Sequence, residues 1–255
     1  MQPLLFEHPL NERTRTLLRI SHLFDQFEYH LPADSAWHSR VAVQALLDIV
    51  NILARADIKT EMIKQLDQHA RTLEAMASNP EVDQERLERV LSDIRRTGER
   101  LHAAEGQLGN RLRKNEFLNG IAQRLPIPGG SFEFDLPQFH YWLHLPQETR
   151  IDQLDRWRRE IAVVQDAVEL LLGLLRNSNL PREMTASGGL YHRSLDPKQK
   201  EVEMLQVTLD PGLGLYPEIS GNKHRFTIRF MDTADWQQPE TTPNDVPFTL
   251  KTCVI

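Results

Sequence analysis

The sequence predicts an α+β protein in which a mostly helical domain, a helical bundle, is joined to a smaller antiparallel β domain. Apolar residues recur every three or four positions from about residue 10 to about residue 180, which is the period of helices. After about residue 200 they recur at every second position, which is the period of strands. We therefore expect the helical domain to cover residues 1–126 and 138–180, and the β domain residues 127–137 and 181–255.

The expected helices follow in order along the first two thirds of the chain. The first places Leu17, Ile20 and Phe24 on one face and ends at Leu31-Pro32, because the residue before a proline is disfavoured in a helix. Further helices are expected after Asp34, over residues 58–76, from Pro80 to about residue 101, and up to about residue 125. Asn79-Pro80 and the glycines at 106 and 109 separate them.

The strongest helical pattern covers residues 150–176. Thr149 and Asp152 have the spacing of a helix cap. Apolar residues then alternate at spacings of three and four over about three heptads, the pattern of a continuous seam. The seam fits either the core of a bundle or a dimer contact. Its residues are Leu154, Trp157, Ile161, Val164, Val168, Leu171 and Leu175.

The expected strands are marked by alternation and by turns. One contains Leu205, Val207 and Leu209, a second Phe226, Ile228 and Phe230, and a last one Phe248, Leu250 and Val254. The central tract IPGGSFEFDLPQFHYWLHLP (127–146) also alternates at Phe132, Phe134 and Leu136, so we expect it to add a strand to the same sheet. Residues 185–200, with two adjacent glycines and several charges, are expected to form a mobile loop.

Composition narrows the class of protein. The 255 residues carry a net charge of −6, which disfavours a general nucleic-acid-binding protein. No run approaches the roughly 18 to 20 apolar residues of a membrane span, and the N-terminus lacks the basic start and apolar core of a signal peptide. The single cysteine, Cys253, rules out an intrachain disulfide and is expected to be a buried thiol. We therefore expect a cytoplasmic protein.

Catalytic motifs are scarce. The sequence contains no P-loop, no GxGxxG after a strand, no HExxH and no GxSxG. His140 and His144 lie four residues apart and would share one face of a helix, so a metal-dependent hydrolase is one alternative. However, Tyr141 stands where such a motif has its glutamate, and no third ligand is evident. We expect no enzyme activity, no metal and no cofactor.

Basic clusters give a stronger indication of function. Between residues 220 and 231 there are three Lys or Arg residues and no acid: Lys223 in a turn, then Arg225 and Arg229 on one face of the second strand. Arg15 and Arg19 share a face of the first helix. Such clusters are often only solvated, and a nucleic-acid-binding module is a third alternative. Guanidinium groups beside aromatic residues suit an acidic peptide best, because they hold carboxylates while apolar pockets hold side chains.

Four segments of the chain resemble the ZapD family of cell-division proteins. They are FEHPLNERTRTLLRI (6–20), EVDQERLERVL (81–91), the central tract and LYPEISGNKHRFTIRFM (215–231), in the order and at about the spacing of that family. The resemblance implies a helical domain with a smaller β domain, a homodimer, and binding to the C-terminal tail of the tubulin-like protein FtsZ. It also implies cross-linking of FtsZ filaments into bundles at midcell, without catalysis, cofactor, nucleic acid or membrane span.

The resemblance also identifies candidate binding residues. Arg15, Arg19, Arg113, His140, Arg225 and Arg229 match basic positions of the family, and Lys223 adjoins the last two. Glu116 stands where a basic residue is expected, which leaves the contribution of residues 111–116 open, although Arg111 or Lys114 could compensate.

Overall fold

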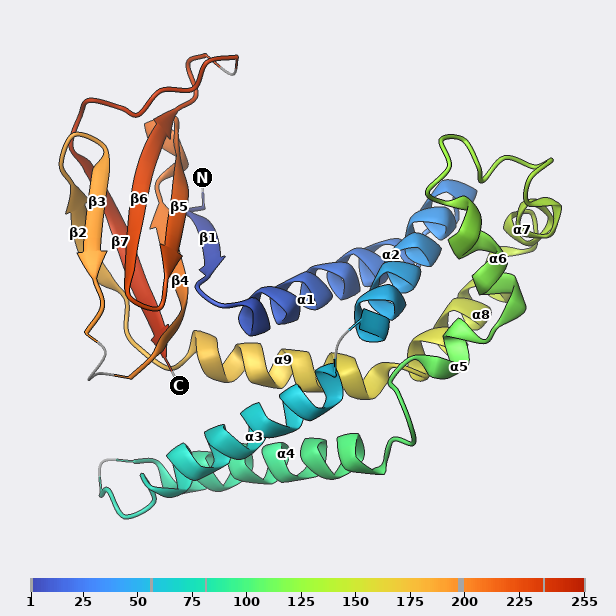
Figure 1. The fold of residues 1–255 in the computed structure, drawn as a ribbon, viewed down its shortest axis with the longest axis horizontal. Coiled ribbons are helices and arrows are strands. Elements are labelled where there is room, and N and C mark those ends of the chain that lie inside the picture. Colours follow the sequence, from blue (N-terminus) through green and yellow to red (C-terminus); the bar gives the residue numbers. More distant parts are fainter. Residues whose placement is uncertain (1, 56, 81, 197–199, 236, 255) are drawn as a thin grey trace. The chain divides into compact units, whose positions relative to one another are not determined.

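The computed structural model describes residues 2–55, 57–80, 82–196, 200–235 and 237–254. The chain divides into two compact units. The first, here called the β unit, comprises residues 1–16 and 172–255, and the second, the helical unit, comprises residues 17–171. Figure 1 shows the strands in one unit and most of the helices in the other. The predicted α+β fold class is confirmed.

The helical unit is built on amphipathic helices whose apolar faces are buried. Ile20, Phe24 and Phe27 of the first helix are buried, as their spacing predicts, together with Leu46 and Ile49 of the second. Among the described residues no helix is long and apolar enough to cross a membrane. The helices are α1 (Glu12–His30), α2 (Ala36–Arg55), α3 (Ile58–Glu74), α4 (Gln84–Ala103), α5 (Asn110–Arg113), α6 (Glu116–Arg124), α7 (Pro137–Leu143), α8 (Gln147–Arg159) and α9 (Ala162–Arg176), with α1 and α9 continuing into the β unit.

The predicted single helix over residues 150–176 is wrong, because α8 and α9 are separate helices. The chain makes a tight turn where the amide of Ile161 bonds to the carbonyl oxygen of Arg158 (3.0 Å). The expected cap is also absent, since α8 begins at Gln147 after Pro146 without a side-chain cap. Every residue of the predicted seam is nevertheless buried within the single chain, which favours the core interpretation over the dimer seam.

The β unit is a sandwich of two antiparallel sheets (Figure 1). The larger sheet has the order β1-β4-β7-β2 and the smaller the order β3-β6-β5. Leu205, Val207 and Leu250 of the larger sheet share one core with Phe226 and Phe230 of the smaller, so the predicted alternation is confirmed. The strands are β1 (Leu4–Pro9), β2 (Arg182–Ala186), β3 (Leu190–Ser194), β4 (Val202–Leu209), β5 (Leu215–Asn222), β6 (Arg225–Asp232) and β7 (Val246–Val254).

Strand β1 is a feature that the sequence pattern does not reveal. Its Glu7 lies opposite Gln206 of β4, and the carboxylate accepts hydrogen bonds from Gln206 Nε2 (2.8 Å) and from both Nε and Nη2 of Arg176 (2.8 Å each). Glu203, buried at an irregularity of β4, accepts a hydrogen bond from Thr14 Oγ1 (2.9 Å). These contacts fix the first turn of α1 and the last turn of α9 within the β unit.

Two further expectations about local structure are wrong. Residues 127–136 form turns within the helical unit and give no strand to the sheet. Phe132 and Phe134 alternate in the sequence but are 55% and 78% exposed, so no buried face stabilises an extended segment there. Residues 185–200 are not simply a loop, because they contain the end of β2 and all of β3, joined by a turn in which Gly188 and Gly189 have positive φ. Residues 197–199 lie outside the described residues.

Candidate partner-binding site

The outer face of the smaller sheet carries a row of polar side chains centred on β6. Arg225, Thr227 and Arg229 project from this face, whereas Phe226, Ile228 and Phe230 point into the core. His192 of β3 lies opposite Thr227, and its Nδ1 is 3.3 Å from the threonine hydroxyl. The strand therefore presents its two arginines on a rigid surface fixed by the core beneath it.

A short turn places Lys223 beside Arg225. Asn222 ends β5 and pairs with Arg225, so Lys223 and His224 alone connect the two strands. The Asn222 side chain accepts hydrogen bonds from the amides of His224 (2.9 Å) and Arg225 (3.3 Å). At Gly221 any Cβ would lie 2.7 Å from that of Phe226, so the close strand pairing requires glycine.

The charges of this surface are only partly neutralised. Arg229 Nη2 is 3.0 Å from Glu218 Oε2 of the neighbouring strand, in a pair whose side chains are 56% and 44% exposed. Lys223 and Arg225 are exposed and form no ion pair with another described residue. We call Lys223, Arg225 and Arg229 the basic strand.

The two candidate residues of α1 lie on either side of the boundary between the units. Arg15 belongs to the β unit, forms an ion pair with Glu12 one turn earlier, and is near His8. Burial, and then the positive charge of Arg15, lower the pKa of His8, so this histidine is mainly neutral at pH 7. Arg19 is exposed in the helical unit and forms no ion pair with another described residue.

Arg113 lies at the end of α5 and is held by its own helix and the preceding loop. Its Nη2 donates to Gln107 Oε1 (2.6 Å) and Asn110 Oδ1 (3.3 Å), while its buried Nε has no hydrogen-bond partner among the described residues. It lines a cavity of about 660 Å³ between α2 and α6. Arg113 is therefore partly satisfied within the helical unit.

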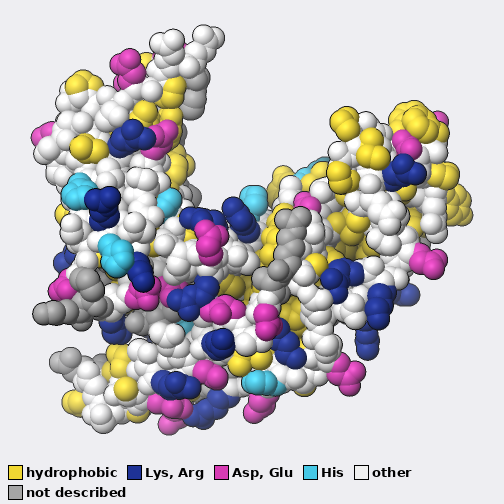
Figure 2. All heavy atoms as spheres, viewed as in Figure 1, with side chains coloured by type: hydrophobic (Ala, Val, Ile, Leu, Met, Phe, Trp, Pro, Cys, Tyr) yellow, Lys and Arg dark blue, Asp and Glu magenta, His cyan; other side chains and the backbone are white. Residues whose placement is uncertain are grey.

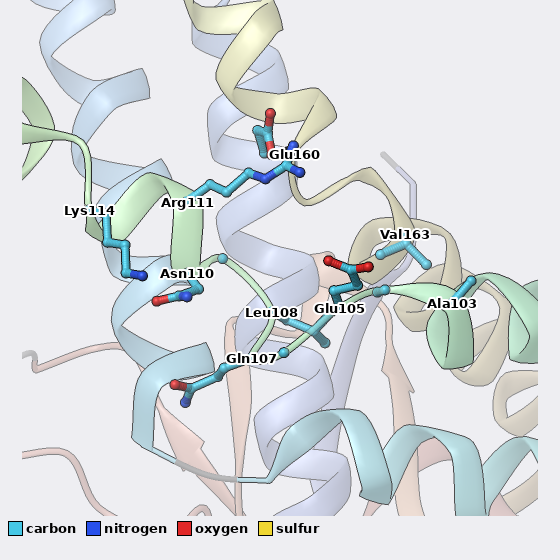
Figure 3. A pocket seen from close by; sticks show the side chains of 12 residues that line it. Ala103, Glu105, Gln107, Leu108, Asn110, Arg111, Lys114, Glu160 and Val163 are labelled. Carbon is cyan, nitrogen blue, oxygen red and sulfur yellow. Dashed lines mark ion pairs between the residues drawn. The ribbon is translucent and has the colours of Figure 1, made fainter.

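The neighbouring charges show what the 111–116 stretch can contribute. Figure 3 shows a second cavity of the helical unit, of about 840 Å³, in which the Arg111 side chain extends toward Glu160; the two charged groups are 3.5 Å apart. Lys114 reaches toward the same cavity and is exposed. Glu116 is the first residue of α6, where its carboxylate interacts favourably with the helix dipole. Its presence thus has a structural reason.

His140 and His144 lie on and just after α7. His140 Nε2 is 3.4 Å from Glu133 Oε2, and His144 Nδ1 is 2.8 Å from the carbonyl oxygen of His140. The described residues contain no group of three or more His, Cys, Asp or Glu side chains placed to hold a metal ion. Nothing in the described residues thus supports the alternative of a metal-dependent hydrolase.

Several aromatic residues near His140 in the sequence are exposed. Phe132, Phe134 and Tyr141 are more than half exposed, and Figure 2 shows hydrophobic side chains gathered over the part of the helical unit that contains α7. Beneath them Arg40 lies 5.1 Å from the Phe139 ring and donates to the carbonyl oxygen of Ser131 (3.1 Å).

Of the seven candidate residues, the structure brings Lys223, Arg225 and Arg229 together on one surface. Arg15 is in the same unit, whereas Arg19, Arg113 and His140 belong to the helical unit, where Arg113 and His140 have separate partners. Sequence reasoning missed two further cations of the β unit that line one groove, Arg182 of β2 and Arg193 of β3. They went unnoticed because Arg193 lies in a segment expected to be a loop, although the alternation of Tyr191 with its neighbours could have indicated a strand.

Comparisons with known proteins all indicate one family. The sequence model of a family described as "ZapD: Cell division protein" matches residues 18–229. A cell division protein ZapD from Janthinobacterium sp. is 37% identical over 250 residues, which cover 98% of this chain and 99% of the relative. Proteins of the same name from Methylococcus capsulatus and Chromobacterium violaceum are each 38% identical, over 252 and 249 residues, and cover 99% and 97% of this chain and 98% of each relative.

Proposed function

Because the chain belongs to the ZapD family of cell-division proteins, we propose that it binds the C-terminal tail of FtsZ and cross-links FtsZ filaments. In this proposal it is a binding protein rather than an enzyme, uses no cofactor, and acts as a homodimer at the cytoplasmic division site at midcell. Each dimer offers two tail sites, so one dimer bridges two filaments.

The observation that carries the proposal is the basic strand. Lys223 and Arg225 are exposed without an ion pair among the described residues, and Arg229 has only a surface glutamate as partner. Surface pairs of this kind are worth about 0 to 1 kcal/mol, so a peptide carboxylate can displace Glu218 at little cost. The strand is rigid because Phe226, Ile228 and Phe230 anchor it in the core. A preformed row of guanidinium groups suits an extended acidic segment.

Repetition of the tail along a filament makes a weak site sufficient. When two sites of a dimer engage two tails, the second binding step is intramolecular and its effective concentration is high. Binding at exposed charges also weakens with added salt, because screening acts over about 8 to 10 Å at 0.1 to 0.15 M ionic strength. We therefore expect salt-sensitive cross-linking that depends on the dimer.

A direct test is the titration of a fluorescently labelled FtsZ tail peptide with the purified protein, followed by anisotropy at low and high salt. A scrambled peptide of the same composition is the control, and sedimentation analysis gives the oligomeric state. We expect saturable binding of the tail that weakens with salt, and a dimer. Equal binding of the scrambled peptide, or a monomer at the concentrations that bundle filaments, would contradict the proposal.

A further inference from the structure

A groove at one end of the sandwich contains cations that form no ion pair with another described residue. Its volume is about 700 Å³, and the described residues that line it all belong to the β unit. Three of these residues, Arg182, Arg193 and Lys200, are cations, and among the described residues they form no ion pair. Asp196 is the only acid among the described lining residues. The groove thus has an excess of positive charge in a chain whose net charge is −6.

The floor of the groove is apolar. Met184 and Val202 are partly buried against the core of the sandwich, and Leu250 is buried within it. Leu180, at the rim, is 78% exposed. Arg193 is the register partner of Phe226 and therefore lies on the core-facing side of β3. An apolar floor with cations around it suits a peptide that carries both carboxylates and an apolar side chain.

The groove is continuous with the basic strand. Ser194, which lines the groove, is the register partner of Arg225, and the amide of the next residue, Leu195, donates to the carbonyl oxygen of His224 (2.7 Å) in the turn beside Lys223. A chain lying over the basic strand thus reaches the groove without leaving the β unit. Among the described strands, β2 and β3 are edge strands of their sheets, so each has one edge without a described partner strand.

We propose that this groove is a second part of the peptide site, which binds an apolar side chain on Met184, Val202 and Leu250 and carboxylates on Arg182 and Arg193. The proposal rests on the proposed function, since the occupant is the tail that the basic strand holds. It adds that recognition extends beyond charge, because a site with an apolar floor discriminates between acidic peptides of different sequence.

The test compares two double charge reversals in the tail-peptide anisotropy assay. The variant Arg182→Glu/Arg193→Glu changes the groove, and Arg89→Glu/Arg96→Glu makes the same change of net charge on the exposed face of α4. We expect the groove variant to bind the tail at least about tenfold more weakly, because charge-assisted hydrogen bonds are lost. The α4 variant should bind within about twofold of wild type, since Arg89 and Arg96 do not line the groove and their exposed ion pairs with Glu85 and Asp93 contribute little. Arg193→Lys should retain most of the affinity.

A measurement on the wild-type protein tests the groove without depending on whether the variants fold. With methionine methyl groups labelled by ¹³C, the Met184 signal should shift as the tail peptide is added, whereas the buried Met204 and Met231 should not respond. A tail that binds wild type and is weakened by Arg225→Glu, while the groove variant binds normally and Met184 is silent, would overturn the groove but leave the proposed function intact. A tail that does not bind wild type would overturn both. A Met184 shift produced by a DNA duplex and not by the tail would overturn the assignment to a peptide.

Discussion

Reversing the charge of the basic strand should remove partner binding while leaving the fold intact, and the structure sets the size of both effects. Arg225 forms no ion pair with a described residue, and Arg229 forms one exposed pair with Glu218 at 3.0 Å. Losing that pair costs about 0.2 to 1 kcal/mol of stability, and placing a glutamate opposite Glu218 costs a similar amount. The double variant Arg225→Glu/Arg229→Glu should therefore unfold no more than about 2 kcal/mol more easily than wild type.

The effect on binding should be much larger. A hydrogen bond that involves a charged group contributes about 1.5 to 3 kcal/mol, which is roughly a 10- to 100-fold change in affinity for each arginine that holds a carboxylate. We would measure the affinity for the labelled tail peptide by anisotropy and the stability by urea unfolding. Arg89→Glu is the matched control for Arg229→Glu, because it reverses an exposed arginine that also pairs with a glutamate, Glu85, at 3.8 Å.

The reciprocal variant sharpens the test. Glu218→Gln frees Arg229 from its only described partner and should raise the affinity a few-fold, by about the value of one surface pair. A folded double variant that binds the tail as tightly as wild type would refute the reasoning. So would a Glu218→Gln variant that loses affinity, because it would make Glu218 rather than Arg229 the group that contacts the partner.

Three further predictions concern buried polar groups of the fold. Arg150→Met should lower the free energy of unfolding by about 2 to 4 kcal/mol in urea titrations. The reason is that the buried guanidinium donates to Ser39 Oγ (2.7 Å) and to the carbonyl oxygens of Asp34 (2.9 Å) and Leu145 (3.1 Å). A loss below about 1 kcal/mol would show that these hydrogen bonds do not stabilise the fold. Burial raises the pKa of the Glu203 carboxyl above its ordinary 4.5. The free energy of unfolding of wild type, relative to that of Glu203→Gln, should therefore fall as the pH rises through the raised pKa. A difference in unfolding free energy between the two proteins that does not change with pH would contradict this prediction. Burial raises the pKa of the Cys253 thiol to about 11. At pH 8, Ellman's reagent should therefore react with this thiol only after the protein is unfolded. Fast reaction with the native protein would show that the thiol is not buried.

The sequence alone predicts the parts of this fold that depend on local periodicity. The alternation of Phe226, Ile228 and Phe230 with polar residues determines which face of β6 is buried, and that places Arg225 and Arg229 on the outer face. The helical seam from Leu154 to Leu175 is likewise buried as its spacing implies. In both segments, the residues that recur in the apolar pattern are the residues that the fold buries.

Features that depend on contacts distant in the sequence could not be predicted in this way. Strand β1 exists because it pairs with β4, about 200 residues further along the chain, and its apolar pattern is too short to indicate this. The turn between α8 and α9 contains neither glycine nor proline, and the apolar spacing continues across it, so the pattern gives no sign of a break. The reverse holds at Phe132 and Phe134, which alternate as in a strand but have no buried surface to pack against.

The candidate site likewise has one part that the sequence predicts and one part that it does not predict. The basic strand is evident from three cations within a short alternating segment. Arg182 and Arg193, in contrast, line one groove only because the fold brings β2 of one sheet and β3 of the other to it. The position of Arg113, held by Gln107 and Asn110, likewise depends on the loop before α5.

The central claim, that the protein cross-links filaments through the FtsZ tail, is tested most directly by pelleting. Purified protein is mixed with FtsZ and GTP, and in parallel with FtsZ that lacks its C-terminal tail, and both the pellet and the bundles are measured. The account predicts bundles and co-pelleting with intact FtsZ and neither with the truncated form. Bundling of both forms, or of neither, would contradict it.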